Sequence, residues 1–109
     1  MIDISVVVPT FNRKEGLAKC VRSLIKQDYP KDRFEVIIID DGSKEKLEGL
    51  EELCRDSRNA SLPAVRIFRQ ENQGPAAARN WGVRLAGGDI VAFIDDDCEA
   101  CPDWLARMV

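Results

Sequence analysis

The chain has 109 residues, of which 45% are hydrophobic and 32% charged, a composition typical of a soluble globular domain with one core. Its 16 basic and 19 acidic residues give a net charge of -3, so no bulk attraction to nucleic acid or to an anionic membrane is expected. The chain contains no histidine, which excludes an imidazole catalyst or metal ligand within it.

The amino-terminal stretch MIDISVVVPTF does not resemble a secretion signal, because it lacks a basic region and Asp3 interrupts its short apolar run. No stretch approaches the roughly 18 apolar residues that would indicate a membrane span. The default expectation is a cytoplasmic location, which for a longer parent protein includes the cytoplasmic face of the membrane.

The first elements in chain order are a strand and a helix. Residues 4–8 form a largely β-branched run that is bounded by Pro9, which predicts a strand. Apolar residues then recur at helical spacing over residues 13–27, which predicts a helix with Asn12 as its N-cap. The segment DYPKD at 28–32 is expected to end that helix.

A second strand and helix follow. The apolar run at 34–39 predicts a strand that ends in the sequence DDGS. Residues 44 to about 57 place leucines on one face, which predicts a helix, and residues 58–63 read as a loop. Apolar and charged residues alternate over 64–69, which predicts a more peripheral strand.

The remaining elements are a helix, a strand and a further helix. Pro75 suits the first turn of a helix, which continues over residues 76–86 until the two glycines at 87–88 stop it. The apolar run at 90–94 predicts the last strand. The sequence PDWLARMV at 102–109 predicts a final helix that the chain leaves unfinished.

Apolar strands separated by helices predict an α/β fold, in which a mostly parallel sheet has helices on both faces and right-handed crossovers. No repeat or linker interrupts residues 1–109, so we expect a single domain. The sequence lacks the GxGxxG of a dinucleotide-binding Rossmann domain and the GxxxxGK[ST] of a P-loop. A receiver domain would carry acidic residues after its first strand and a nucleotidyltransferase a glycine-rich loop, and PTFNR provides neither.

Polar motifs follow three of the predicted strands. They are PTFNR after the first strand, DDGS after the second and DDDC after the last. The carboxyl ends of parallel strands meet at one edge of the sheet, where open α/β sheets bind their ligands. Together these motifs predict a ligand site at that edge.

The acidic run Asp95, Asp96 and Asp97 is the sharpest of these signals. Adjacent carboxylates in a crevice repel one another unless a cation neutralises them. Oxygen ligands without histidine or cysteine partners favour Mg²⁺ or Mn²⁺, with water and substrate phosphates completing the coordination shell. The alternative is a solvated acidic loop that caps the following helix.

The other motifs have structural alternatives as well. DDGS is a common turn sequence, yet one of its aspartates could accept hydrogen bonds from a ligand. Phe11 could pack in the core or stack on a base, and Arg79 could face a phosphate or solvent. Trp81 and Leu85 are expected in the core.

The cysteines are expected to be reduced thiols. Cys20 and Cys54 lie on the apolar faces of predicted helices, where a free cysteine behaves as a small hydrophobe. Cys98 and Cys101 form a single CxxC, for which a metal or redox role is the minor alternative because a zinc site usually has further cysteine or histidine ligands.

The segments SVVVPTFNR, VIIIDDGS, NQGPAAARNWGVRLAGGDIVAFIDDD and PDWL together resemble the nucleotide-sugar half of a family 2 inverting glycosyltransferase with the GT-A fold. The resemblance covers essentially the whole chain. It implies that a longer parent protein transfers a sugar from a UDP- or GDP-type nucleoside-diphosphate sugar to the hydroxyl of an unknown acceptor, with Mg²⁺ or Mn²⁺. Residues 1–109 would be its nucleotide-binding, Rossmann-like part.

The resemblance also assigns roles at the nucleoside end of the site. Pro9, Thr10 and Phe11 would line the nucleoside pocket, with Phe11 against the base. Asp41 would bind the base through a ring N–H, and Asp40 would support it.

Further along the site, the resemblance places Arg79 close to the nucleotide. The three aspartates would form the family's DXD motif. Asp95 and Asp96 would approach the ribose and sugar, and Asp97 would coordinate the metal, with Asp95 as a second ligand. Cys98 departs from the family pattern, which commonly has a polar or acidic residue there.

No residue of the chain resembles the general base of the family, which is expected beyond Val109 together with the acceptor site. The chain alone would then bind a nucleotide without catalysing transfer, and its exposed sheet edge would favour self-association or homo-oligomers. The alternatives are a non-catalytic nucleotide-binding module and an inactive fragment.

Overall fold

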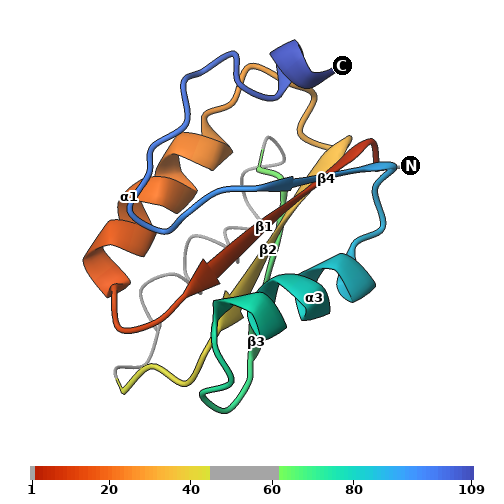
Figure 1. The fold of residues 1–109 in the computed structure, drawn as a ribbon. Helices are drawn as coiled ribbons and strands as arrows, with labels where there is room; N and C mark the ends of the chain where they lie inside the picture. The colour runs from red at the N-terminus through yellow and green to blue at the C-terminus, as the bar shows by residue number, and fades with distance from the viewer. Residues whose placement is uncertain (1, 45–61) are drawn as a thin grey trace.

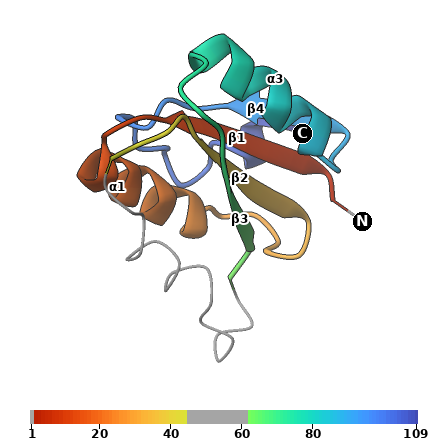
Figure 2. The same cartoon turned by 90° about the horizontal axis from the view of Figure 1, so that it is seen from below.

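The computed structural model describes residues 2–44 and 62–109. They form a four-stranded parallel sheet in the order β3-β2-β1-β4, with α1 on one face and α3 on the other (Figures 1 and 2). The elements in chain order are β1 (Ile4–Thr10), α1 (Lys14–Ile25), β2 (Phe34–Asp40), β3 (Ala64–Arg69), α3 (Pro75–Leu85), β4 (Ile90–Phe93) and the 3-10 helix η1 (Ala106–Met108).

The predicted α/β class is confirmed, and so are the strands at 4–8, 34–39, 64–69 and 90–94 to within two residues. The helix predicted over 44–57 lies outside the described residues, as does Cys54. β3 and β4 are the edges of the sheet, and self-association through them stays a prediction. Among the described residues, no helix combines the length and the apolar character needed to cross a bilayer.

The two faces of β1 supply two separate cores. Ile4, Val6 and Val8 are buried against α1, whereas Val7 is buried against α3. Both faces are covered because successive side chains of a strand point to opposite sides of the sheet. This explains why β1 is a nearly continuous apolar run rather than an alternating one.

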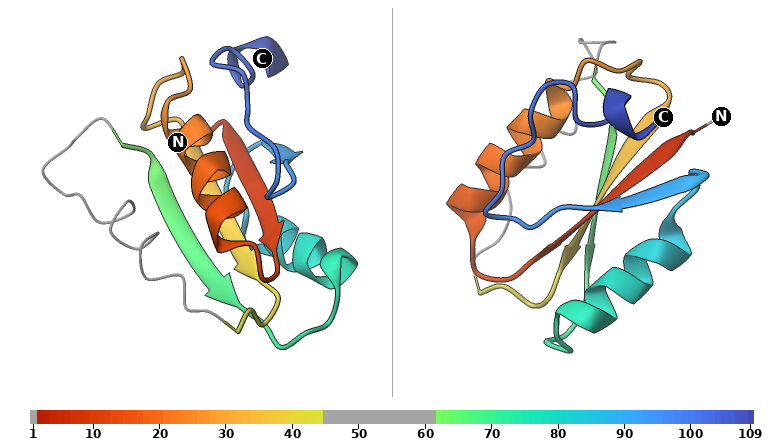
Figure 3. Two further views of the ribbon diagram at one scale, coloured as in Figure 1. Left: turned by 90° about the vertical axis from the view of Figure 1, so that its left-hand side faces the viewer. Right: turned by 45° about the horizontal axis from the view of Figure 1, so that its top comes forward.

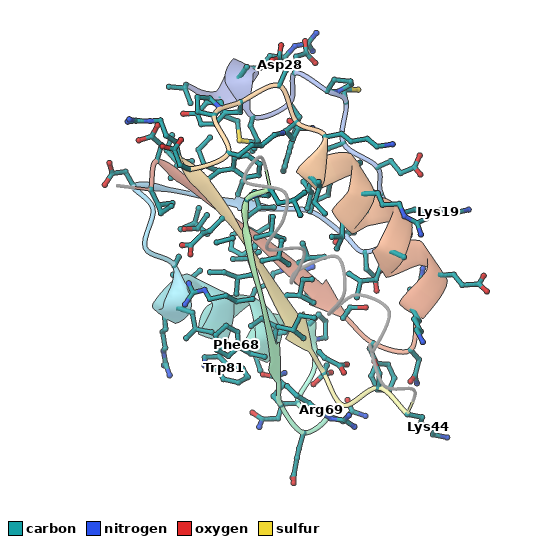
Figure 4. The ribbon with its side chains drawn as sticks, turned by 180° about the vertical axis from the view of Figure 1, so that it is seen from behind. Lys19, Asp28, Lys44, Phe68, Arg69 and Trp81 are labelled. Carbon is teal, nitrogen blue, oxygen red and sulfur yellow. The ribbon has the colours of Figure 1, made fainter. Side chains whose placement is uncertain are left out.

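The α1 side of the core is closed by the segment that follows β4. That segment runs back along α1 to the amino end of the sheet, where η1 lies (Figure 3). Leu105 is buried there, and Trp104 and Met108 pack against the same cluster. On the opposite face, the rings of Phe68 and Trp81 lie side by side with centroids 5.6 Å apart (Figure 4), so Trp81 packs against the core as expected.

The helix predicted over 102–109 is wrong. These residues form turns and the short η1, because Gln27 takes up the backbone groups that an α-helix would use. The Gln27 side chain donates to the Cys101 carbonyl at 2.6 Å and accepts from the Leu105 N–H at 2.9 Å. An isolated eight-residue segment has too few internal hydrogen bonds to offset the cost of helix nucleation.

The N-cap prediction is also wrong. Arg13 holds the N-cap position of α1 and makes no side-chain capping hydrogen bond. Asn12 has a positive φ of 53° and accepts a hydrogen bond from the Lys44 N–H at 2.9 Å. An asparagine tolerates this left-handed conformation better than most residues, so Asn12 serves the loop contact instead of the helix.

A buried carboxylate, Glu35, joins β1, β2 and β3 to the turn before β4. It accepts hydrogen bonds from the Ser5 hydroxyl at 2.6 Å, the Gly87 N–H at 2.8 Å and Arg66 at 2.7 Å. Burial raises the pKa of Glu35, but these donors outweigh it and hold the pKa below its ordinary value of 4.5. The ionised form therefore stabilises the fold.

Close approach of α3 to the sheet depends on Gly82. A Cβ atom at this position would lie 2.3 Å from Cγ1 of Val7, a side chain that is fully buried between the layers. The small residues of α3 therefore set the distance between helix and sheet, as the sequence suggests. A glycine costs about 1 kcal/mol within a helix, which the close packing outweighs here.

We predict that Gly82→Ala lowers the free energy of unfolding by about 1–3 kcal/mol, because Val7 cannot yield without disturbing β1. Urea denaturation measures the change. The control is Gly87→Ala, whose added Cβ would meet its nearest atom at an ordinary 3.5 Å. Equal stability of wild type and Gly82→Ala would contradict the close packing.

We predict that Glu35→Gln lowers the free energy of unfolding at pH 7 by about 2 kcal/mol, since it weakens charge-assisted hydrogen bonds. The folded-state pKa of Glu35 is lowered, so the wild type loses this contribution as the pH falls below 4.5. Denaturation curves from pH 7 to pH 3 should show the difference shrinking. Glu71→Gln, at an exposed position, is the control, and a constant difference would contradict the assignment.

Candidate functional site

The polar motifs that follow β1, β2 and β4 meet at the carboxyl edge of the sheet, where α1 and α3 also begin (Figure 1). They surround an open cavity of about 480 Å³. Its lining consists of Pro9, Thr10, Phe11, Arg13, Asp41, Asn72, Gly74, Pro75, Ala78, Arg79, Asp95, Asp96 and Asp97. Every site residue expected from the sequence lines this cavity except Asp40.

Asp40 lies beside the cavity and shapes the turn after β2. Its Oδ1 accepts hydrogen bonds from the Ser43 N–H at 2.9 Å and the Ser43 hydroxyl at 2.6 Å. The Ser43 hydroxyl oxygen in turn accepts from the Asn12 N–H at 2.8 Å. Asp40 therefore ties the loops after β1 and β2 together and holds the neighbouring Asp41 in place.

Asp41 is buried at the base of the cavity, where it anchors the loop before α3. Its Oδ1 accepts from the Gln70 amide at 2.8 Å and the Gln73 N–H at 2.7 Å, and its Oδ2 accepts from the Gly74 N–H at 3.0 Å. Burial raises the pKa of Asp41, but these three donors lower it overall, which keeps the carboxylate ionised. A carboxylate can accept about four hydrogen bonds, so Oδ2 retains capacity for a further donor.

The three adjacent aspartates differ in orientation and exposure. Asp96 is turned inward, and its Oδ2 accepts a hydrogen bond from the Thr10 hydroxyl at 2.8 Å. Asp95 and Asp97 are exposed and lie on the cavity side. A carboxylate oxygen of each lies within 4.8 Å of the other and of the Cys98 sulfur.

This cluster fits a hard divalent ion. Burial and the neighbouring Asp97 carboxylate raise the pKa of Cys98, which disfavours the thiolate that binds metal ions. The oxygens of Asp95 and Asp97 remain as donors, which suits Mg²⁺ or Mn²⁺ ions that keep several waters or phosphate oxygens. The sequence-predicted metal ligands are thus the two aspartates that the fold turns outward together.

Two arginines flank the aspartates. Arg79 Nη2 lies 3.8 Å from Asp95 Oδ1, while Arg13 Nη1 lies 3.6 Å from Asp97 Oδ2. Arg79 was expected near this site, but Arg13 and Asn72 were missed. Arg13 belongs to the PTFNR motif itself, so its position directly after β1 was the signal that could have identified it.

Cys20 lies beneath the acidic cluster, where its thiol donates a weak hydrogen bond to the Asp95 carbonyl at 3.6 Å. Burial, reinforced by the nearby aspartates, raises the pKa of Cys20 to about 12, so this thiol is inert. Cys98 and Cys101 are free and exposed, and both line a neighbouring groove with Phe93 and Trp104. The reduced state of the cysteines stays a prediction.

Comparison with known proteins identifies the family. Residues 5–109 match the family described as Glycosyl transferase family 2. Glycosyltransferase AglE from Haloferax volcanii is 37% identical over 106 residues, which are 97% of this chain and 34% of that protein.

Solved structures show the same architecture. The Staphylococcus aureus TarS 1-349 structure in complex with UDP-GlcNAc has a TM-score of 0.85 at 31% identity, covering 98% of this chain and 30% of that one. Mannosyltransferase PcManGT from Pyrobaculum calidifontis, in complex with GDP-Man and Mn²⁺, has a TM-score of 0.83 at 29% identity. The match covers 94% of this chain and 30% of that one. The chain thus spans about a third of the length of these relatives.

The α/β sheet with helices on both faces is the Rossmann-like arrangement of the GT-A fold, as expected from the motifs. The match extends over nearly all of the described residues and includes the strands and loops that build the cavity. The chain therefore belongs to glycosyl transferase family 2.

Proposed function

We propose that this chain provides the nucleotide-sugar site of an inverting glycosyltransferase, which transfers a sugar from a nucleoside-diphosphate sugar to an acceptor hydroxyl with the help of a divalent metal. The observation that carries the proposal is the cavity at the carboxyl edge. It places an aromatic ring, a buried carboxylate, two guanidinium groups and a pair of outward carboxylates around one space. Relatives solved with UDP-GlcNAc or with GDP-Man and Mn²⁺ support the same ligand class.

The base and ribose would occupy the end of the cavity near β1 and β2. Phe11 lines the cavity and is 41% exposed, so its ring is available to stack on the base. The free acceptor position on Asp41 Oδ2 would take a ring N–H of the base. Pro9 and Thr10 would form the wall between these two groups.

The diphosphate and sugar would lie toward the aspartates. Arg79 lines the cavity on the α3 side, where its guanidinium could pair with phosphate oxygens. Asp95 and Asp96 would face the ribose and sugar, and Asp97 with Asp95 would hold Mg²⁺ or Mn²⁺. The bound metal would stabilise the negative charge that builds on the departing nucleoside diphosphate.

Inverting transfer also needs a general base for the acceptor hydroxyl. Each aspartate of the cavity already has another role: Asp41 accepts from the loop before α3, Asp96 accepts from Thr10, and Asp95 and Asp97 lie beside arginines and would hold the metal. We therefore propose that the base and the acceptor site come from a segment beyond Val109, as in a parent protein of the length of the relatives. On this proposal the chain alone binds nucleotide and does not transfer sugar.

We predict that UDP or GDP binds in the presence of Mn²⁺ and that Asp97→Asn weakens this binding by a factor on the order of ten to a hundred, as expected for losing a charged contact. Isothermal titration calorimetry with and without Mn²⁺ measures the nucleotide affinity of each variant. Asp103→Asn, which makes the same charge change beside Arg107 and outside the cavity, is the control. Metal-independent binding would favour a non-catalytic nucleotide module, and no heat at all would favour an inactive fragment.

We predict that Asp41→Asn abolishes the base contact while leaving metal binding intact. The amide NH₂ group would replace either Oδ2, where it meets the Gly74 N–H, or Oδ1, where it meets the donors of Gln70 and Gln73, so stability should fall by about 2 kcal/mol. Mn²⁺ affinity without nucleotide should match that of the wild type, whereas UDP affinity should fall at least roughly tenfold. Unchanged UDP affinity in the folded variant would contradict the role of Asp41.

A further inference from the structure

The acidic cluster already has a cation beside it, supplied by the loop that follows β1. The Arg13 guanidinium lies between two aspartates, with Nη1 3.6 Å from Asp97 Oδ2 and Nε 4.0 Å from Asp96 Oδ1. Asp96 is held in place by the Thr10 hydroxyl, so the pair is anchored on its inner side. The outer partner, Asp97, has a side chain that is 59% exposed and therefore open to a ligand from solvent.

The position of Arg13 leaves room for its side chain to move away from the aspartates. It is 59% exposed and extends from the N-cap of α1 without a capping bond. Arg13 and Asp97 line both the site cavity and a second cavity of about 560 Å³, which also has Lys14 and Lys44 in its lining. The ion pair thus stands in the wall between two open spaces.

We propose that Arg13 acts as the resident counter-cation of the acidic cluster, so that a divalent ion binds Asp97 by displacing the Arg13 guanidinium. The inference rests on the proposed metal-dependent nucleotide site. It adds an exchange of charges, in which the metal takes over the carboxylate and the freed guanidinium pairs with a phosphate of the nucleotide.

The exchange predicts coupled binding. A metal ion alone competes with Arg13 for Asp97, and a diphosphate alone meets a guanidinium that is already paired. When both ligands are present, each removes the competitor of the other, so each should raise the affinity of the other by the same factor. The ion pair is exposed and longer than a tight hydrogen bond, so displacing it costs little and the coupling should be moderate.

The decisive experiment titrates Mn²⁺ into the chain without nucleotide and follows the electron paramagnetic resonance signal of the free ion. Arg13→Gln should bind Mn²⁺ about threefold to tenfold more tightly than the wild type, as removing one exposed charge at this separation implies. Arg13→Lys keeps the charge, so its Mn²⁺ affinity should remain close to that of the wild type. Arg22→Gln is the matched control, because Arg22 is exposed on the same helix and lines neither cavity.

A second titration repeats these measurements with saturating UDP. The gain in Mn²⁺ affinity caused by UDP should be larger in the wild type than in Arg13→Gln, because only the wild type has a guanidinium to transfer to the phosphate. Circular dichroism checks that the variants are folded.

Several results would overturn the inference. Arg13 does not compete for the cluster if Arg13→Gln binds Mn²⁺ no more tightly than the wild type or does not bind it at all. The same conclusion follows if Arg22→Gln gains as much Mn²⁺ affinity as Arg13→Gln. If the wild type still bound UDP with Mn²⁺ in those cases, the proposed function would stand without the exchange. Absence of UDP binding to the wild type would overturn the proposed function instead, while the titration without nucleotide would still decide the role of Arg13.

Discussion

The parallel pairing of β1 with both β2 and β4 is the constraint on which the site depends. Thr10 pairs with Asp40 at the end of β2, and Val7 pairs with Phe93 at the end of β4. This register brings the loops after three strands to one edge, although they are far apart in the chain. Apolar side chains buried on both faces hold β1 in the middle of the sheet, and the hydrogen bond from Ser5 to Glu35 joins β1 to β2 in this register.

The carboxylates at this edge have two roles. The buried ones stabilise the fold, and the exposed ones remain available to bind a ligand. Asp40 and Asp41 are satisfied by a hydroxyl and by N–H groups of neighbouring loops, and Asp96 by Thr10. The carboxylates of Asp95 and Asp97 are exposed and lie beside arginines at 3.6–3.8 Å, and Asp97 also accepts a weak hydrogen bond from the Cys98 thiol at 3.6 Å. A buried carboxylate without donors would be costly, whereas an exposed pair can exchange one cation for another.

Much of the architecture could be predicted from local patterns. The apolar runs at β1 and β2 and the helical spacing of α1 and α3 identified these elements, and Gly82 in a run of small residues indicated a helix close to the sheet. The errors arose where a distant side chain decided the outcome. Gln27 captures the backbone near Leu105 in place of a terminal helix, and Asn12 contacts Lys44 in place of capping α1.

The sequence by itself determined the order of strands and helices, because the spacing of apolar residues is a local property. It also placed polar motifs at the ends of strands, and in a parallel sheet those ends share one edge. Only the tertiary structure decided which aspartate turns inward, which donors hold Asp41 and that Arg13 lies against Asp97. These are distances between residues in separate loops. No hydrophobic period encodes them, since they depend on how the loops pack once the sheet has formed.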